Sequence, residues 1–222
     1  CAREAAVPGS REDGVDGRRL RVYCSVEAHY SIPKSLGILG LGRRNLVLIP
    51  SDEVGGMQPE ALDAAIAADL QAGLIPTMIC ATSGTTVRGA FDPLDRIADV
   101  AERHDVWFHV DGALGGSMLL SPSGRALMRG VERADSLTWD AHKMMGVPLT
   151  CSLLLVRERG RITASLSQAA SYLFQGGSDE LNPGTRSLQC GRRNDVLKLW
   201  AAWQYHGRVG FAARVDRQIA LA

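Results

Sequence analysis

The sequence predicts an α/β protein built around a mostly parallel β-sheet. Six short runs of apolar and β-branched residues alternate with helical patterns, and this alternation is typical of βαβ units. Most runs are apolar at successive positions, as in strands that helices cover from both sides. The six candidate strands span residues 20–26, 46–49, 75–81, 106–110, 136–139 and 151–156.

The first elements follow one another in a regular order. Residues 1–19 are polar and rich in Gly, Arg, Asp and Glu, so we expect a connector or the remnant of a helix. Residues 59–71 are predicted to form a helix, because leucine and isoleucine recur every four residues behind an initial proline. A second helix is predicted over residues 93–104, with Asp92 as its N-cap.

The last third of the chain has a different pattern. Residues 157–186 contain Gly and Pro without a regular period, which predicts a loop. Apolar and aromatic residues recur at helical spacing over residues 194–207, and an amphipathic stretch continues to residue 222. Because the chain starts with Cys and lacks the features of a signal peptide, we expect a segment of a longer protein.

Composition and charge narrow the function classes. The 25 basic and 24 acidic residues give a formal charge of +1, which argues against nucleic acid or an anionic membrane surface as a partner. Apolar runs stay well below the roughly 20 residues that cross a bilayer. The five cysteines are odd in number and lie mostly in or beside apolar runs, which indicates reduced thiols and a cytoplasmic protein.

Chemically versatile residues follow several of the predicted strands. Ligands of an open parallel sheet gather at the carboxyl ends of its strands. The residues at those ends include His29, Thr82, Asp111 and Lys143. A lysine amine can form a Schiff base with an aldehyde, a carboxylate can keep a pyridine nitrogen protonated, and an imidazole can stack on the ring. Together these groups predict a site for pyridoxal phosphate and a small-molecule substrate, and no metal site.

Each residue also has a plainer explanation when it is taken alone. An Asp after a strand is often a cap or turn residue, and a Lys in a polar turn is usually solvated. The hydroxyl residues 82–86 can form a turn held by side-chain to backbone hydrogen bonds. It is therefore the combination that indicates a site.

Longer motifs carry a family resemblance. They are Ala28-His29-Tyr30-Ser31, Ala81-Thr82-Ser83-Gly84-Thr85-Thr86, His109-Val110-Asp111-Gly112-Ala113 and Thr138-Trp139-Asp140-Ala141-His142-Lys143-Met144-Met145-Gly146-Val147-Pro148. In order and spacing they resemble the group II pyridoxal-phosphate-dependent decarboxylases, most closely the glutamate decarboxylase and cysteine sulfinate decarboxylase branch. The resemblance implies the large domain of the aspartate aminotransferase fold (fold type I). Residues 20–222 would be the central part of that domain, without the N-terminal segment and the C-terminal small domain.

The resemblance also implies roles for individual residues. Lys143 would form the Schiff base and Asp111 would pair with the pyridine nitrogen, while His29 and Ala113 would lie on opposite faces of the ring. Tyr172 matches a tyrosine on a mobile catalytic loop that returns a proton after carbon dioxide leaves. Further contacts with the cofactor are implied for Thr82, Asp140 and His142.

The implied activity is decarboxylation of an acidic L-amino acid, namely glutamate, aspartate or cysteine sulfinate, by a homodimer. One alternative is a truncated relative that keeps the fold without turnover. Others are a decarboxylase of 2,4-diaminobutyrate or of an aromatic amino acid, and an enzyme that couples decarboxylation to oxidative deamination.

Overall fold

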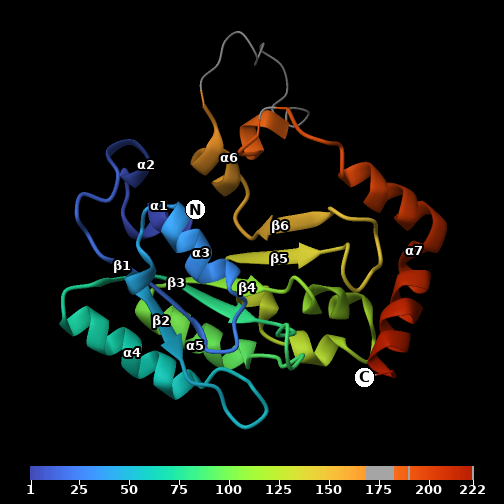
Figure 1. Ribbon diagram of the computed structural model, residues 1–222, viewed down its shortest axis with the longest axis horizontal. Coiled ribbons are helices and arrows are strands. Elements are labelled where there is room, and N and C mark those ends of the chain that lie inside the picture. The colour runs from blue at the N-terminus through green and yellow to red at the C-terminus, as the bar shows by residue number, and fades with distance from the viewer. Residues whose placement is uncertain (169–182, 190, 222) are drawn as a thin grey trace.

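A six-stranded sheet forms the centre of the protein in the computed structural model, which describes residues 1–168, 183–189 and 191–221 (Figure 1). The strands are β1 (Leu20–Ser25), β2 (Leu46–Ile49), β3 (Ile75–Thr82), β4 (Trp107–Asp111), β5 (Ser136–Asp140) and β6 (Ser152–Val156). They lie in the order β2-β1-β3-β4-β5-β6, and only β6 runs antiparallel to its neighbour within this sheet. The predicted α/β class and its mostly parallel sheet are confirmed, and each predicted strand end is right to within one residue.

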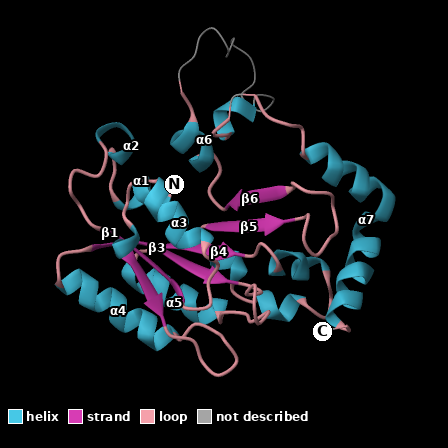
Figure 2. Cartoon of the chain, in the orientation of Figure 1, coloured by secondary structure: helices cyan, strands magenta, loops and turns pink. Residues whose placement is uncertain are grey.

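Seven α-helices surround the sheet in the part of the chain that the structure describes (Figure 2). They are α1 (Ala2–Ala6), α2 (Ser10–Asp13), α3 (Ser31–Ile38), α4 (Pro59–Gln71), α5 (Leu94–His104), α6 (Arg161–Leu166) and α7 (Val196–Ile219). Helix α4 has its predicted bounds, whereas α3 was not predicted. Helix α6 lies inside a segment that was predicted to be a loop, so that prediction is wrong for six residues. None of the described helices is long and apolar enough to cross a membrane.

The role predicted for Asp92 is wrong. Helix α5 begins at Leu94 with Pro93 in the N-cap position. The Asp92 side chain is buried and accepts hydrogen bonds from the backbone N–H groups of Met57 (2.7 Å) and Thr82 (2.6 Å). A buried amide without a partner is costly, so this carboxylate serves the end of β3 and the loop after β2 instead of the helix.

The two faces of the sheet have different tasks. Phe108 and Val110 of β4 belong to the main apolar core, together with Leu62 of α4 and Ile97 of α5. Side chains alternate along a strand, so the other three residues of β4 point to the opposite face. Those residues are Trp107, His109 and Asp111. The polar positions of β4 therefore lie away from the α4–α5 layer.

Helix α7 supports the turn that follows β5. Its Phe211 is fully buried and packs in a second apolar cluster with Met145. The Arg214 Nη1 atom donates a hydrogen bond to the Met145 carbonyl (2.9 Å), and Gln218 Nε2 donates one to the Met144 carbonyl (2.8 Å). The helical prediction for the C-terminal region is confirmed, and α7 bends at Gly207, whose φ is +58°. This helix holds the 144–145 turn from outside the sheet.

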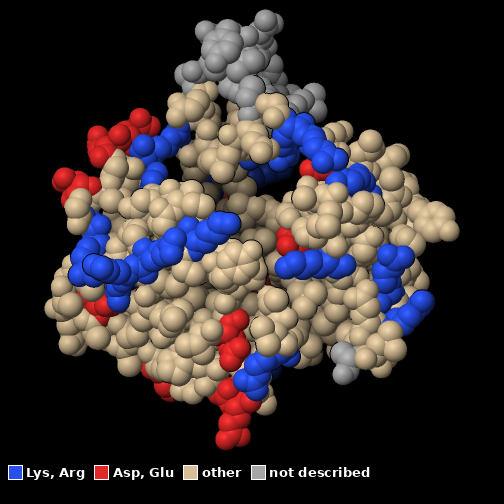
Figure 3. All heavy atoms as spheres, viewed as in Figure 1, with Lys and Arg blue, Asp and Glu red and all other residues tan. Residues whose placement is uncertain are grey.

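Both signs of charge occur on the face of the molecule in Figure 3. Several of the ion pairs join neighbouring elements, such as Arg21 of β1 with Asp69 of α4 (2.9 Å) and Arg103 of α5 with Asp63 of α4 (2.7 Å). This mixed surface agrees with the formal charge of +1.

Candidate active site

A cavity of about 470 Å³ opens at the carboxyl ends of the central strands. Six of the eight predicted site residues line it: His29, Thr82, Asp111, Ala113, Asp140 and Lys143. The seventh, His142, is adjacent but does not line the cavity. The eighth, Tyr172, lies outside the described residues. The strand ends thus bring together residues that are more than 100 positions apart in the sequence.

Lys143 is presented by a tight turn after β5. Its backbone N–H donates to the Asp140 carbonyl (3.0 Å), and the Gly146 N–H donates to the Lys143 carbonyl (2.9 Å). Gly146 has φ +68°, a conformation that glycine adopts without strain. The Lys143 side chain is 40% exposed, so its amine is within reach of a small molecule.

Asp140 lies between two basic side chains. Its Oδ2 atom is 3.5 Å from Lys143 Nζ and 3.7 Å from His142 Nε2. His142 Nδ1 lies 3.0 Å from the Cys151 carbonyl oxygen and 3.1 Å from the Cys151 backbone nitrogen, so this edge of the ring is held by the Cys151 backbone. Asp140 therefore faces the Lys143 amine and the Nε2 edge of the His142 ring, and the opposite edge of that ring is fixed to Cys151, just before β6.

Asp111 places a carboxylate in the cavity at the carboxyl end of β4. One of its oxygens accepts the Ala113 N–H (3.1 Å). No hydrogen bond from the described residues reaches the second oxygen, which leaves it free for a ligand. The chain then passes very close to the end of β3, because a Cβ on Gly115 would lie 2.5 Å from the Ser83 carbonyl oxygen. Glycine is therefore required at position 115 for this close packing.

Thr82 and His29 complete the walls of the cavity. Thr82 is only 5% exposed, and its Oγ1 has no hydrogen-bond partner among the described residues. In folded proteins a buried hydroxyl normally has a hydrogen-bond partner, so this group is free to bind a ligand. His29 Nδ1 lies 2.9 Å from Ser31 Oγ and accepts the Ser31 backbone N–H (3.3 Å), which orients its ring.

Sequence reasoning assigned no role to several of the residues that line the cavity, among them His109 and Thr138. The His109 Nε2 and Thr138 Oγ1 atoms are 3.3 Å apart. Burial lowers the pKa of His109, which favours the neutral ring. The alternation of a strand contained the necessary signal, because residue 109 shares a face with Asp111, and residue 138 shares one with Asp140.

The donors do not suggest a metal centre. Within residues 1–168, 183–189 and 191–221, no cluster of three His, Cys, Asp or Glu side chains is arranged to hold a metal ion. The cavity instead combines an amine, two carboxylates, imidazoles and hydroxyls. This set suits an organic ligand that carries both charge and hydrogen-bonding groups.

Comparison with known proteins gives a consistent result. The family model described as the pyridoxal-dependent decarboxylase conserved domain matches residues 4–222. Human acidic amino acid decarboxylase GADL1 is 42% identical over 228 residues, which cover 100% of this chain and 43% of the relative. Cysteine sulfinic acid decarboxylase of Mus musculus is 46% identical over 208 residues, which cover 91% of this chain and 42% of the relative.

Solved structures agree with the sequence comparison. The crystal structure of mouse CSAD matches with a TM-score of 0.94 and 42% identity over 99% of this chain. The structure of Oryza sativa TDC with PLP and tryptamine matches with a TM-score of 0.92 and 37% identity over the whole chain. In each case the match covers 46% of the solved chain. The chain thus spans less than half the length of these relatives and has their fold over that part.

Proposed function

Because this chain belongs to the pyridoxal-dependent decarboxylase family, we propose that it forms the cofactor-binding part of an enzyme that decarboxylates an acidic L-amino acid. The cofactor would be pyridoxal 5'-phosphate, and residues 20–222 would be the central part of its large domain. The observation that carries the proposal is that Lys143 and Asp111 share one cavity at the carboxyl ends of parallel strands.

The residues of the cavity fit this cofactor. The Thr82 hydroxyl is buried without a partner, and the second Asp111 oxygen accepts no hydrogen bond from the described residues. A ligand with an acceptor and a cationic ring nitrogen would satisfy both groups. When bound, pyridoxal 5'-phosphate supplies an aldehyde that reacts with amines and a ring that takes up the electrons released by decarboxylation.

Each side chain of the cavity has a defined task in this proposal. Lys143 holds the aldehyde covalently through its amine, and Asp140 keeps the side chain of that lysine at the cavity wall. Asp111 keeps the ring nitrogen protonated, because a carboxylate favours a nearby positive charge. His29 and Ala113 enclose the flat ring.

Two further roles concern the phosphate and the proton. The Nδ1 edge of His142 is held by the Cys151 backbone, and we assign to this residue a contact near the phosphate. We assign to Tyr172 the return of a proton to the substrate Cα atom. Both assignments follow from the motif match.

Relatives support the acidic substrate class. The two curated relatives are named for an acidic amino acid and for cysteine sulfinic acid, so we propose glutamate, aspartate or cysteine sulfinate as the substrate. An aromatic amino acid is the second candidate, because a solved relative with a TM-score of 0.92 holds tryptamine.

A substrate panel tests the proposed reaction. The protein, saturated with pyridoxal 5'-phosphate, is expected to release labelled carbon dioxide from the α-carboxyl group of cysteine sulfinate, aspartate or glutamate. Release from tryptophan alone would favour the aromatic class. A folded protein that binds the cofactor but releases no carbon dioxide from any of the four would be a silent relative, and the proposed activity would be wrong.

We also propose that the complete protein is a cytoplasmic homodimer. The described cysteines Cys1, Cys24, Cys80 and Cys151 are unpaired, as expected in a reducing compartment. Helix α7 exposes large side chains, namely Val196, Leu197, Trp200, Tyr205 and Val209. Exposed apolar side chains grouped on one element favour a covering partner.

Sedimentation velocity checks this expectation. The 222-residue chain is expected to sediment as a dimer or larger species, because α7 exposes several apolar side chains. Trp200→Glu should shift the distribution towards the monomer, whereas Leu188→Glu, at an exposed position outside α7, should not. A monodisperse monomer at micromolar concentration would contradict the prediction.

A further inference from the structure

Strands β4 and β5 carry polar side chains in two facing columns. His109 lies opposite Ser136 in the register of the two parallel strands, and Asp111 lies opposite Thr138. Trp107 precedes His109 on the same face of β4. We call Trp107, Ser136, His109 and Thr138 the polar ladder. It ends beside Asp111, in the cavity.

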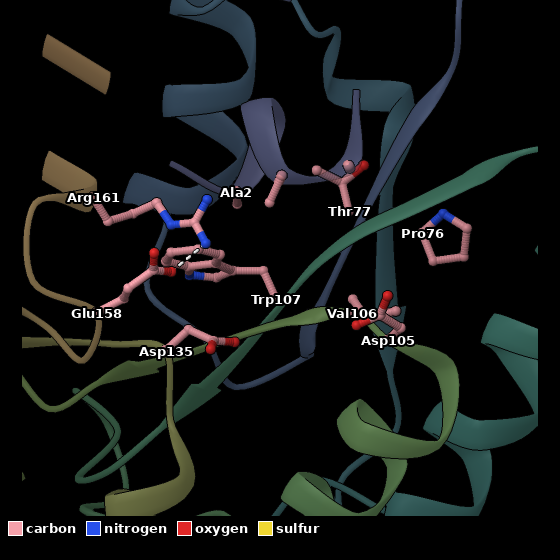
Figure 4. Close-up of a pocket in the computed structure, with 11 residues that line it drawn as sticks. Ala2, Pro76, Thr77, Asp105, Val106, Trp107, Asp135, Glu158 and Arg161 are labelled. Carbon is pink, nitrogen blue, oxygen red and sulfur yellow. Dashed lines mark hydrogen bonds and ion pairs between the residues drawn. The ribbon is translucent and has the colours of Figure 1, made fainter. Parts of the chain in front are cut away.

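The far end of the ladder lies in a second, smaller pocket of about 200 Å³. Trp107 lines this pocket together with Arg161 and Glu158, and Figure 4 shows the Arg161 side chain next to the indole ring. Arg161 and Glu158, which are three positions apart in the sequence, form an ion pair at one side of the pocket. The ladder therefore connects a charged pocket at the start of β4 with the cavity at its end.

The direction of the hydrogen bonds along the ladder follows from chemistry. Indole Nε1–H is only a donor, and it lies 2.9 Å from Ser136 Oγ. Ser136 is buried, so its own hydroxyl proton needs an acceptor, and the available atom is His109 Nδ1 at 2.8 Å. With Nδ1 as an acceptor, the proton of a neutral His109 lies on Nε2 and faces Thr138 Oγ1.

The charge of His109 matters because of its neighbours. The titratable side chains that share the cavity with it are His29, Asp111, Asp140 and Lys143. Burial lowers the pKa of His109, whereas the negative charge of Asp111 and a hydrogen bond with the Ser136 backbone raise it by less. A protonated His109 would place a positive charge on the same face of β4, two residues from Asp111. It would then compete with a cationic ligand for the negative charge of the Asp111 carboxylate.

We propose that Trp107, Ser136 and His109 are positioning residues for Asp111. Their hydrogen-bond chain holds His109 as the neutral Nε2–H tautomer, so the charge of Asp111 remains available to a cationic ring nitrogen. With its oxygen accepting from His109, the Thr138 hydroxyl keeps its own proton for a ligand in the cavity. The tautomer follows from the ladder alone, whereas its effect on the cofactor rests on the proposed function.

Nuclear magnetic resonance of ¹⁵N-labelled histidine reads the tautomer directly. In the unmodified chain without added cofactor, the His109 ring is expected to give the shifts of the neutral Nε2–H form at pH 7. Trp107→Phe frees the Ser136 oxygen to accept from Nδ1–H, so a mixture of tautomers is expected. Trp139→Phe is the matched control, because that indole donates to Ser117 (2.9 Å) outside the ladder. A neutral Nδ1–H ring or a protonated ring in the unmodified chain would overturn the proposal.

Cofactor binding tests the consequence for Asp111. Ser136→Ala and Trp107→Phe are each expected to raise the dissociation constant of pyridoxal 5'-phosphate roughly tenfold. Trp139→Phe should leave that constant unchanged. If both ladder variants change the tautomer but bind the cofactor as before, the link to Asp111 is wrong. If the unmodified chain binds no cofactor, the proposed function fails, and the ¹⁵N spectrum still decides whether the ladder sets the tautomer.

Discussion

Replacing Lys143 with alanine is expected to abolish covalent capture of pyridoxal 5'-phosphate. The sequence contains three lysines, Lys34, Lys143 and Lys198. Of these, Lys143 lines the cavity, with its Nζ atom 3.5 Å from an Asp140 oxygen. An imine between a lysine and an aldehyde becomes a stable amine when it is reduced with borohydride. Peptide mass spectrometry of the reduced protein is therefore expected to find the phosphopyridoxyl group on the peptide that contains Lys143.

The other two lysines provide matched controls. Lys198 is held away from the cavity by Asp195 (2.7 Å) and by the Thr150 carbonyl (2.8 Å), and Lys34 is an exposed residue of α3. Lys34→Ala and Lys198→Ala should both keep the modification on Lys143. A modified Lys34 or Lys198 at equal yield would mean non-specific reaction with the aldehyde, and the assignment of Lys143 would be wrong.

The fold was largely predictable because it depends on local patterns. Helix α4 has its predicted bounds, since its apolar spacing and its initial proline act within the segment itself. Asp92 shows the limit of this approach. An Asp followed by a helix has the pattern of an N-cap, but the amides of Met57 and Thr82 compete for the same carboxylate. Those donors come from segments 35 and 10 residues away, and only the folded chain brings them together.

The candidate site was predictable to a similar extent. Residues at the last position of a strand or just after it, such as Asp111 and Lys143, were found because the carboxyl ends of parallel strands converge. His109 and Thr138 lie inside their strands, where the same rule does not apply. Their inclusion depends on which face of the sheet is polar. That choice follows from the packing of Phe108 and Val110 against α4 and α5.

Asp92 is expected to make the folded protein less stable as the pH rises from 4 to 7. Burial raises the pKa of Asp92 to about 6, although the amides of Thr82 and Met57 favour the charged form. An unfolded Asp titrates near pH 3.9. The folded state thus binds the proton more tightly, and its stabilising effect is complete below the unfolded pKa. The effect disappears as the pH rises through 6, at a cost of about 3 kcal/mol in the free energy of unfolding.

Urea unfolding of the wild type and of Asp92→Asn at pH 4 and pH 7 measures this effect. Asparagine cannot ionise, so the variant is expected to gain about 2 kcal/mol relative to the wild type between the two pH values. This gain is less than the full effect, because an unfolded Asp is already about half ionised at pH 4. Asp63→Asn should show the opposite trend, because hydrogen bonds from His104 and Arg103 hold the pKa of Asp63 below its usual range. The wild type and Asp92→Asn could instead differ by the same free energy of unfolding at both pH values. Ionisation of Asp92 would then not destabilise the folded protein. The amides of Met57 and Thr82 would then compensate fully for its burial, and Asp92 would anchor the Thr82 wall of the cavity as a permanent charge.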